Sequence, residues 1–280
     1  MPSYDISRSR FRLADGHTVV LTESVLGDPV PQEFFAEQQE LLDCGLIDGT
    51  GAVSPLLAPL LETLIRPVVV VTVESDGRQG RLHHGLLIGG DHAVAHQAWP
   101  GEAESEYSLV EPRTAVGALA NMVNLQAANA ADAPAIEVVE ATVGTLDAGL
   151  AAVDSAPLTP SGSEDRDHVR QALADAGGLE EPQLSHFTEM LMEVRASWRM
   201  TAAWRGRDGD DAGLVMRGFG VWDCGPLGYW HRELPAEPVR EGQVDASSVL
   251  RLVRVRPGRV WELISELLPQ PDELRFVGPR

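Results

Sequence analysis

The chain has 280 residues, of which 44% are hydrophobic and 23% are charged, a composition typical of a globular protein with a substantial core. Its formal net charge is -20, and all of its basic residues are arginine. This excess of negative charge argues against binding to nucleic acid or to anionic lipid, because both need a basic surface. We see no signal peptide and no apolar run of about 18 residues, so we expect a cytoplasmic protein without membrane insertion.

The first forty residues predict a hairpin followed by a helix. Residues 1–9 show no periodic pattern and are expected to be frayed. Residues 11–13 and 18–22 flank the pair Asp15-Gly16, which is typical of a two-residue hairpin turn. The apolar spacing of residues 34–42 indicates a helix.

Residues 41–73 predict the end of that helix, a tight turn, a second helix and a strand. Gly45 suits the left-handed position after a helix, and the run from Asp48 to Gly51 is typical of a turn. Ser54 is suited to the start of a helix whose leucines recur at helical spacing as far as residue 64. The β-branched run 68–73 then indicates a buried strand.

Three strands and a helix are expected next. The strands cover residues 81–88, 92–99 and 107–110, and the acidic stretch 102–106 forms a loop before the third. The apolar pattern of residues 114–125 indicates a helix.

After residue 125 the order of elements starts again. Residues 126–134 are rich in alanine and read as a linker, and residues 158–165 and 207–211 read as a loop and a turn. The remaining elements are a strand at 136–139, helices at 150–153, 169–176 and 182–196, strands at 198–204, 214–221, 229–233 and 249–255, and a helix at 259–268.

Two local patterns occur at corresponding places in both parts of the chain. Residues 43–46 precede a helix and a strand, as residues 175–179 do, and Pro112 and Pro257 each follow a strand and precede a helix. We therefore predict a single α+β domain over 1–280, built from two similar halves around a pseudo-twofold axis whose strands pair into one continuous antiparallel twisted sheet. The alternative is two unrelated α+β segments that share common turn chemistry.

The predicted segments are as follows: an N-terminal half-repeat at 10–125, a linker at 126–134, a C-terminal half-repeat at 135–269 and a tail at 270–280.

The sequence offers little for catalysis. It lacks the Gly-x-Ser-x-Gly elbow, the phosphate-binding loop and the dinucleotide fingerprint, and we assign no catalytic residue, metal or cofactor. Cys44 is expected to be a small buried side chain, and Cys224 a more exposed one at a strand end. Four histidines share one predicted hairpin, where zinc binding is the alternative to a partly exposed hairpin without metal. These histidines are His83, His84, His92 and His96.

Two features favour protein binding. Methionine and aromatic side chains on the helix after residue 186 adapt to partner surfaces, and aromatic residues on two neighbouring strands are favoured binding anchors where exposed. The alternative for both sets is an ordinary core. The predicted partner-binding residues are Phe187, Met190, Leu191, Met192, Trp222, Tyr229 and Trp230.

The sequence resembles the EspG family, the cytosolic secretion-associated chaperones of type VII (ESX) secretion in actinobacteria. The resemblance lies in Leu-Asp-Cys-Gly-Leu-Ile-Asp-Gly-Thr-Gly-Ala-Val-Ser-Pro at 42–55, the helix after it, the Arg66-Pro67 step into a valine strand, the segment 220–230 and the ending 256–269. It implies a twisted sheet flanked by two helical bundles, no enzymatic activity, and binding of a helical PE–PPE substrate pair. It also implies contacts through a loop at 75–80, the sheet and the second bundle.

Three functional hypotheses follow. The first is a non-enzymatic chaperone-like protein, a monomer or weak dimer when alone, that binds a helical PE/PPE-like type VII secretion substrate before export. The alternative is a small-molecule-binding or enzymatic protein that uses an open sheet face and the histidine hairpin. A winged-helix regulator is the third, but the acidic charge and the lack of a basic recognition helix oppose it.

Overall fold

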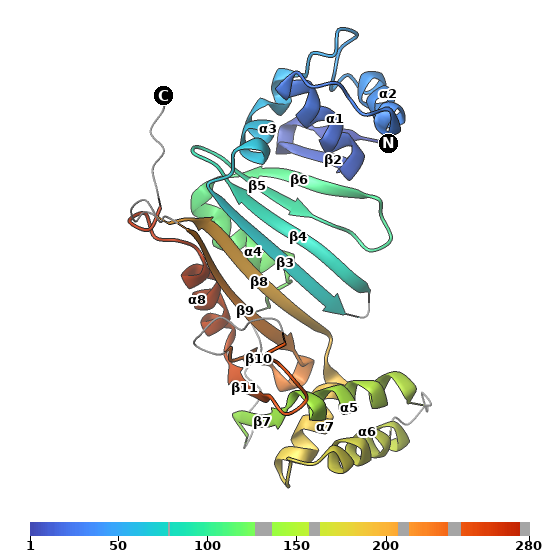
Figure 1. Ribbon diagram of the computed structural model, residues 1–280, viewed down its shortest axis with the longest axis vertical. Helices are drawn as coiled ribbons and strands as arrows, with labels where there is room; N and C mark the ends of the chain where they lie inside the picture. Colours follow the sequence, from blue (N-terminus) through green and yellow to red (C-terminus); the bar gives the residue numbers. More distant parts are fainter. Residues whose placement is uncertain (78, 127–135, 157–162, 207–212, 235–241, 275–280) are drawn as a thin grey trace.

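All strands of the part that the structure describes belong to one antiparallel sheet. The structure is a computed structural model, and it describes residues 1–77, 79–126, 136–156, 163–206, 213–234 and 242–274. The sheet has eleven strands in the order β1-β2-β6-β5-β4-β3-β8-β9-β10-β11-β7 (Figure 1). The predicted α+β fold with a continuous antiparallel sheet is therefore confirmed.

The first half runs from β1 to α4. Its strands are β1 (Ser3–Asp5), β2 (Arg10–Ala14), β3 (Val69–Gly77), β4 (Gly80–Ile88), β5 (Ala93–Gln97) and β6 (Glu104–Val110). Its α-helices are α1 (Asp15–Leu26), α2 (Phe35–Asp43), α3 (Ala58–Ile65) and α4 (Ala115–Met122), with 3-10 turns at Ile6–Arg8, Gln32–Phe34, Pro55–Leu57 and Pro112–Thr114.

The second half repeats the order strand, three helices, four strands, helix that the first half shows from β2 onward. Its strands are β7 (Val138–Thr142), β8 (Ala196–Arg205), β9 (Leu214–Asp223), β10 (Tyr229–Arg232) and β11 (Val249–Val255). Its helices are α5 (Val143–Ser155), α6 (Ser163–Ala176), α7 (Gln183–Glu193) and α8 (Pro257–Leu267), with a 3-10 turn at Gly225–Leu227.

The two halves meet where β3 pairs with β8. The pairing is antiparallel and extends from Val69 opposite Trp204 to Gly77 opposite Ala196, with Val73 opposite Met200 near its middle. On either side the strand order is the same, because β4, β5, β6 and β2 follow β3 as β9, β10, β11 and β7 follow β8. The predicted pseudo-twofold arrangement is confirmed, with its axis at this central pair.

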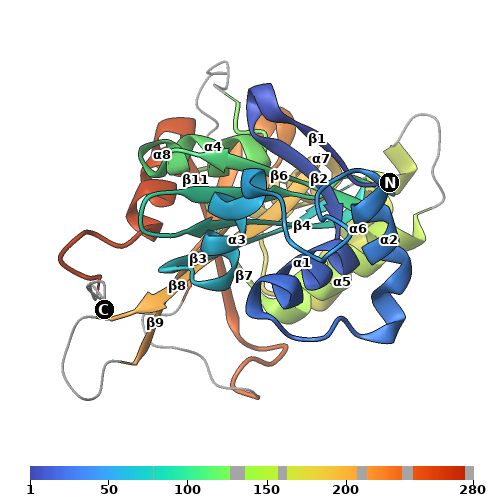
Figure 2. The same ribbon diagram turned by 90° about the horizontal axis from the view of Figure 1, so that it is seen from above.

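Helices cover the two faces of the sheet in different places. Helices α4 and α8 contact each other and cover the central strands on one face, where Val71, Met200 and Ile264 share a core. Figure 2 shows this helix pair beside the sheet. The first bundle (α1–α3) and the second bundle (α5–α7) cover the opposite face at the two ends of the molecule (Figure 1). On that face none of the described helices covers the middle of the central strands β4, β3, β8 and β9, although α3 contacts β4 and Phe187 of α7 stacks on Trp222 of β9.

Several predicted elements are confirmed, but the predicted hairpin is wrong. Gly45 has the left-handed conformation, with φ 75°, and the Asp48 carboxylate accepts the Thr50 and Ala52 backbone N–H groups in the predicted turn. Residues 18–22, however, lie in helix α1 rather than in a hairpin strand. The helix forms because Val20 and its neighbours pack against the other elements of the first bundle, which outweighs the strand propensity of this run.

Three further expectations are corrected. Residues 1–9 are not frayed, because β1 pairs with β2 through Ser3, Tyr4 and Asp5. Residues 104–106 belong to β6 rather than to a loop. The strand at 68–73 is buried on one face alone, since Thr72 is exposed. The predicted linker after Gln126, most of the loop at 158–165 and the turn at 207–211 lie outside the described residues, and the half-repeat boundaries stay predictions.

The close packing of the second bundle can be tested at Gly149 in α5. A Cβ there would lie 2.5 Å from Leu191 Cδ1 and 2.7 Å from Leu173 Cδ2, and both leucines are buried. We expect Gly149→Ala to destabilise the fold by about 1 kcal/mol, because overpacking of about 1–3 kcal/mol exceeds the gain in helix propensity. Urea unfolding measures the change.

Gly117→Ala in α4 is the matched control, since its Cβ would lie 3.8 Å from the nearest atom, Trp261 Cη2. We expect this substitution to be neutral or to stabilise by about 0.5–1 kcal/mol. Equal free energies of unfolding for the two variants would contradict the assigned packing between α5 and its neighbours.

Candidate partner-binding site

In the part of the chain that the structure describes, one face of the central strands carries no helix over its middle and lies between the two bundles. We call it the open face. Its middle row consists of small residues paired across four strands, and Thr72 and Gly218 within it are exposed. Small side chains leave a floor onto which another backbone can pack closely. The row reads Gly85, Thr72, Thr201 and Gly218.

Charged residues follow on the next rows, toward the second bundle. Arg199 lies 4.0 Å from Glu74, and Arg81 lies 3.1 Å from Asp76. All four side chains are largely exposed, so solvent screens these pairs and they contribute little to stability. The open face therefore presents balanced charge, in contrast with the acidic protein as a whole.

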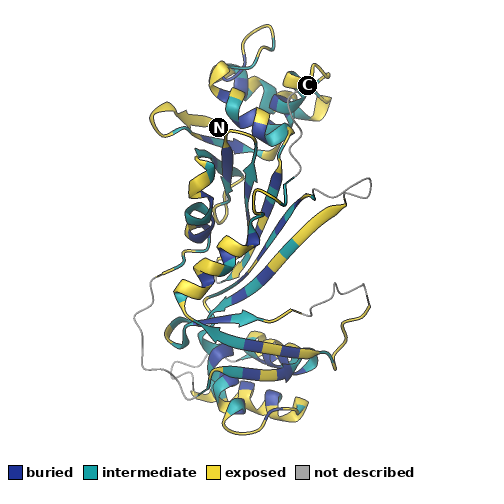
Figure 3. Cartoon of the chain, turned by 90° about the vertical axis from the view of Figure 1, so that its left-hand side faces the viewer, coloured by how far each residue is buried: buried dark blue, intermediate teal, exposed yellow. Residues whose placement is uncertain are grey.

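Apolar side chains lie at both ends of β9 on this face. Leu214 and Met216 are 67% and 61% exposed at one end. At the other end Trp222 is half-buried and stacks on Phe187 of α7, with ring centroids 6.4 Å apart. Figure 3 shows exposed and buried residues alternating along the central strands, as expected for a sheet covered on one side. An apolar partner could contact both ends of β9 across the small floor.

The predicted partner-binding residues are mostly part of the core. Five of them are buried, with at most 5% of their surface exposed, so they offer little surface to a partner in this fold. Met192 and Trp222 are half-buried at the edge of the second bundle, so they alone of the set present some surface. The five buried residues are Phe187, Met190, Leu191, Tyr229 and Trp230.

Internal packing and hydrogen bonds explain this burial. Phe187 and Met190 lie on the side of α7 that packs against α5, α6 and the sheet. Tyr229 Oη accepts the Gln126 backbone N–H at 3.0 Å, and Trp230 Nε1 donates to the Leu227 carbonyl at 3.2 Å. The polar ends of both rings are thus used within the fold. The methionine and aromatic stripe is a core stripe, which was the alternative for these residues.

An open sheet face was expected from the sequence, but the residues that form it were not identified there. The pattern that indicates this face lies in β3, where the buried Val69, Val71 and Val73 alternate with more exposed residues, among them Thr72 and Glu74. This alternation indicates a strand with one open side, but the long valine run hid it. In β9 the corresponding pattern is the spacing of Gly218 and Gly220, which are two residues apart and so lie on the same face of the strand.

The hairpin histidines do not converge on a common centre. His83 and His92 are exposed, whereas His84 is buried and its Nδ1 accepts the Ala98 backbone N–H at 3.1 Å. Burial lowers the pKa of His84 from 6.5 to about 4, and burial also lowers the pKa of His96. Neutral imidazoles are thereby favoured in this hairpin. Within the described ranges, no group of three or more His, Cys, Asp or Glu side chains could hold a metal ion.

The two cysteines are placed opposite to expectation. Cys224 is fully buried, and burial raises the pKa of its thiol, so it is not poised as a nucleophile. Cys44 is half-buried, and its thiol donates to the Leu41 carbonyl at 3.4 Å. Both thiols are free.

One buried histidine does contact a carboxylate. His17 Nε2 lies 3.1 Å from Glu40 Oε2, and its Nδ1 accepts the Ala14 backbone N–H at 2.9 Å. Both ring nitrogens are therefore engaged in holding the start of α1 against α2. This arrangement is structural and does not supply the deep catalytic pocket that an enzyme hypothesis needs.

The arrangement defines a class: a two-half α+β protein with an open sheet face between two helical bundles. In the solved structures, this fold matches the Mycobacterium tuberculosis type VII secretion system chaperone EspG5, seen in complex with a PE25-PPE41 dimer. The match has a TM-score of 0.53 at 15% identity and covers 95% of this chain and 99% of that chain. It shows that the chain has an EspG-like fold, as the sequence resemblance implied.

Other comparisons did not identify a family or a curated relative. No protein-family model matches the sequence, and no curated protein matches it either. Among the helices of the described residues, none is long and apolar enough to cross a membrane.

The buried His84 gives a pH dependence that can be measured. Between about pH 6.5 and pH 4, His84 binds a proton in the unfolded chain but not in the folded chain. The free energy of unfolding therefore falls as the pH falls through this window. His84 should contribute about 2 kcal/mol of stability loss between pH 7 and pH 5. His84→Gln, which keeps an acceptor for Ala98, should reduce this loss in urea unfolding. The exposed His83→Gln is the control, and equal pH dependence in both variants would refute the assignment.

Proposed function

We propose that this protein is a non-enzymatic cytoplasmic chaperone that binds a helical, PE/PPE-like type VII secretion substrate on its open face before export. The observation that carries the proposal is the uncovered, small-residue floor on the central strands of an EspG-like fold. The structurally similar EspG5 was solved in complex with a PE25-PPE41 dimer. A helical hairpin tip placed on this floor would bury apolar surface that export substrates must keep from water.

The geometry suggests how such a tip would sit. The floor around Thr72 and Thr201 allows close approach, while Met216 and Trp222 offer apolar contacts at its two ends. Met192 extends the contact toward the second bundle. The β3–β4 hairpin, with Ser75 and Gly80 near its tip, lies on the same side of the molecule as the second bundle (Figure 1). These residues form the proposed site.

Charge would act mainly on partner choice and solubility. The protein carries a net charge of -20, which keeps the free chaperone apart from copies of itself and favours a monomer or weak dimer. A substrate with basic residues around an apolar tip would be attracted to it. The balanced ion pairs on the open face, Arg199 with Glu74 and Arg81 with Asp76, avoid burying a single unpaired charge.

The site can be tested by placing a charge on the floor. The tagged protein is purified from its native host, and the co-purifying chains are identified by mass spectrometry and quantified. We expect a small helical PE/PPE-like pair in near-equal amount. Thr72→Arg should reduce its recovery at least about tenfold, because a long cation on the floor blocks close packing and is buried unpaired.

Ser265→Arg is the matched control. This residue is exposed on α8, on the other face of the sheet, and the substitution makes the same change in charge. We expect full recovery of the partner and unchanged thermal melting. Equal recovery with both variants would remove the open face from the proposal. A protein that always purifies alone would shift the weight to the small-molecule hypothesis.

A further inference from the structure

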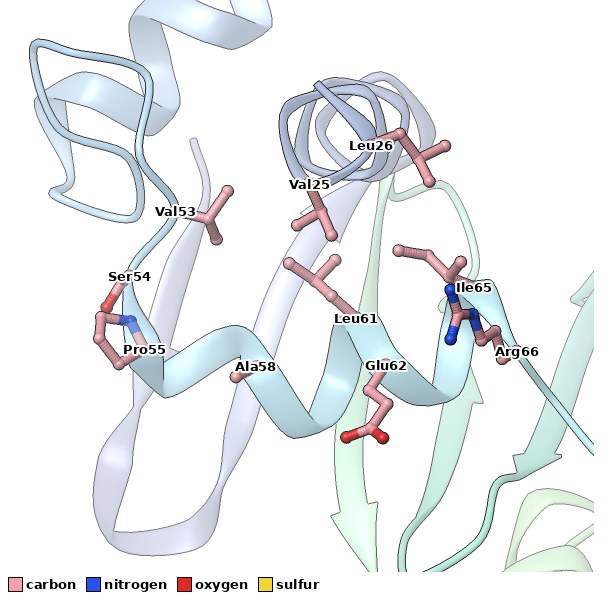
Figure 4. A pocket seen from close by; sticks show the side chains of 10 residues that line it. All are labelled: Val25, Leu26, Val53, Ser54, Pro55, Ala58, Leu61, Glu62, Ile65 and Arg66. Carbon is pink, nitrogen blue, oxygen red and sulfur yellow. The ribbon is translucent and has the colours of Figure 1, made fainter. Parts of the chain in front are cut away.

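A second surface lies outside the open face, in the first bundle. A groove of about 430 Å³ runs between the end of α1 and the length of α3. Figure 4 shows Val25 and Leu26 of α1 facing Leu61 and Ile65 of α3, with Val53 on the same side. We call it the α1–α3 groove. Its polar lining is confined to Ser54, Glu62 and Arg66.

Apolar side chains remain exposed along this groove. Val25 and Leu26 are 48% and 55% exposed, and Leu56, next to the lining residue Pro55, is 42% exposed. Surface leucines are unremarkable one at a time, but a continuous apolar groove marks a binding surface. It lacks the convergent polar groups that orient a small molecule in a pocket.

The segment that builds the first bundle is strongly acidic, although the groove itself is lined by one carboxylate, Glu62, and one arginine, Arg66. Residues 15–66, which contain α1, α2 and α3, hold nine carboxylates and a single arginine, Arg66. The last turn of α1, which ends at the groove, carries no basic residue, so its carbonyl end also favours a cation. The acidic residues of this segment are Asp15, Glu23, Asp28, Glu33, Glu37, Glu40, Asp43, Asp48 and Glu62.

Charge distinguishes between two candidate occupants of the groove, a second copy of this chain and a segment of another protein. A second copy of this chain would bring two such acidic bundles together, and their like charges would oppose pairing. A segment with apolar residues on one side and arginine or lysine on the other would suit both the apolar groove and the net negative charge of the first bundle. A helix has this form when its apolar residues recur at every third or fourth position, and helices bind in such grooves.

We propose that the α1–α3 groove binds a basic amphipathic helix of another protein, independently of the open face. The residues that line the groove belong to the first bundle and to its connections, whereas the floor of the open face is built from β4, β3, β8 and β9. The two surfaces share no residue. A substrate on the open face therefore leaves the groove free, and the protein can hold two partners at once.

The probe is a fluorescein-labelled peptide of about 14 residues, or four helical turns, with leucines at positions i, i+3, i+4 and i+7 and arginines on the other side. Fluorescence anisotropy measures its binding to the full-length protein. A scrambled peptide of the same composition, which cannot form an apolar face, separates groove binding from general attraction to an acidic protein. We expect the patterned peptide to bind at least about tenfold more tightly, with a preference that survives about 0.5 M salt.

Leu26→Glu tests the groove itself. It places a carboxylate among the apolar contacts, and since Leu26 is exposed the fold should be retained. We expect affinity for the patterned peptide to fall at least about tenfold. Leu150→Glu is the matched control, because Leu150 is 44% exposed on α5 of the second bundle and the change in charge is the same. This control and Thr72→Arg should both leave the affinity unchanged.

Hydrogen exchange gives a second readout, with protection expected in α1 and α3 when the peptide is bound. Equal binding of patterned and scrambled peptides, or unchanged affinity in Leu26→Glu, would overturn the proposal. So would a dimer of the protein that Leu26→Glu abolishes in sedimentation, since the groove would then serve self-association. Loss of binding in Thr72→Arg alone would assign the peptide to the open face instead.

Discussion

The pairing of β3 with β8 is the interaction on which the rest of the structure depends. It joins the two halves through a continuous antiparallel register from Val69 to Gly77, so neither half leaves its innermost strand as an exposed edge. Because the pair lies at the pseudo-twofold axis, each half extends its strands outward in the same order. The two bundles then come to the same face of the sheet at opposite ends, and the floor between them follows from that symmetry.

The two faces of this sheet have different chemistry because side chains alternate along each strand. Val71, Met200 and Phe219 point toward α4 and α8 and form a core, whereas Thr72, Thr201 and Gly218 lie on the other side. A core needs large side chains that fill space, whereas a surface onto which another backbone could pack closely needs small ones. The same strands thus stabilise the fold on one face and remain available on the other.

The bundles share a fold but differ at their surfaces. In the second bundle, Arg166 lies 3.1 Å from Glu189, and Arg170 pairs with Glu181, so arginines offset part of the acidic charge there. The first bundle has a single arginine, Arg66, which lines an apolar groove together with Glu62. Symmetry of the backbone therefore coexists with distinct surfaces at the two ends of the molecule.

The sequence by itself determined the elements whose local signals agree with one another. The leucine spacing before Ile65, the glycine at 45 and the proline at 257 each act within a few residues, and the helices and turns that they predict are present. The repeated order of these elements also determined the two-half plan. Local preference could specify this much because it depends on backbone geometry and short-range contacts.

Only the tertiary structure decided which side of each element is covered. The run after His17 has strand propensity, but packing in the first bundle makes it a helix, and the stripe through Phe187 and Met190 is indistinguishable in sequence from an exposed binding stripe. The open face depends on the pairing of Thr72 with Thr201, which lie far apart in the chain. Burial is set by such long-range contacts, and a local pattern cannot specify them.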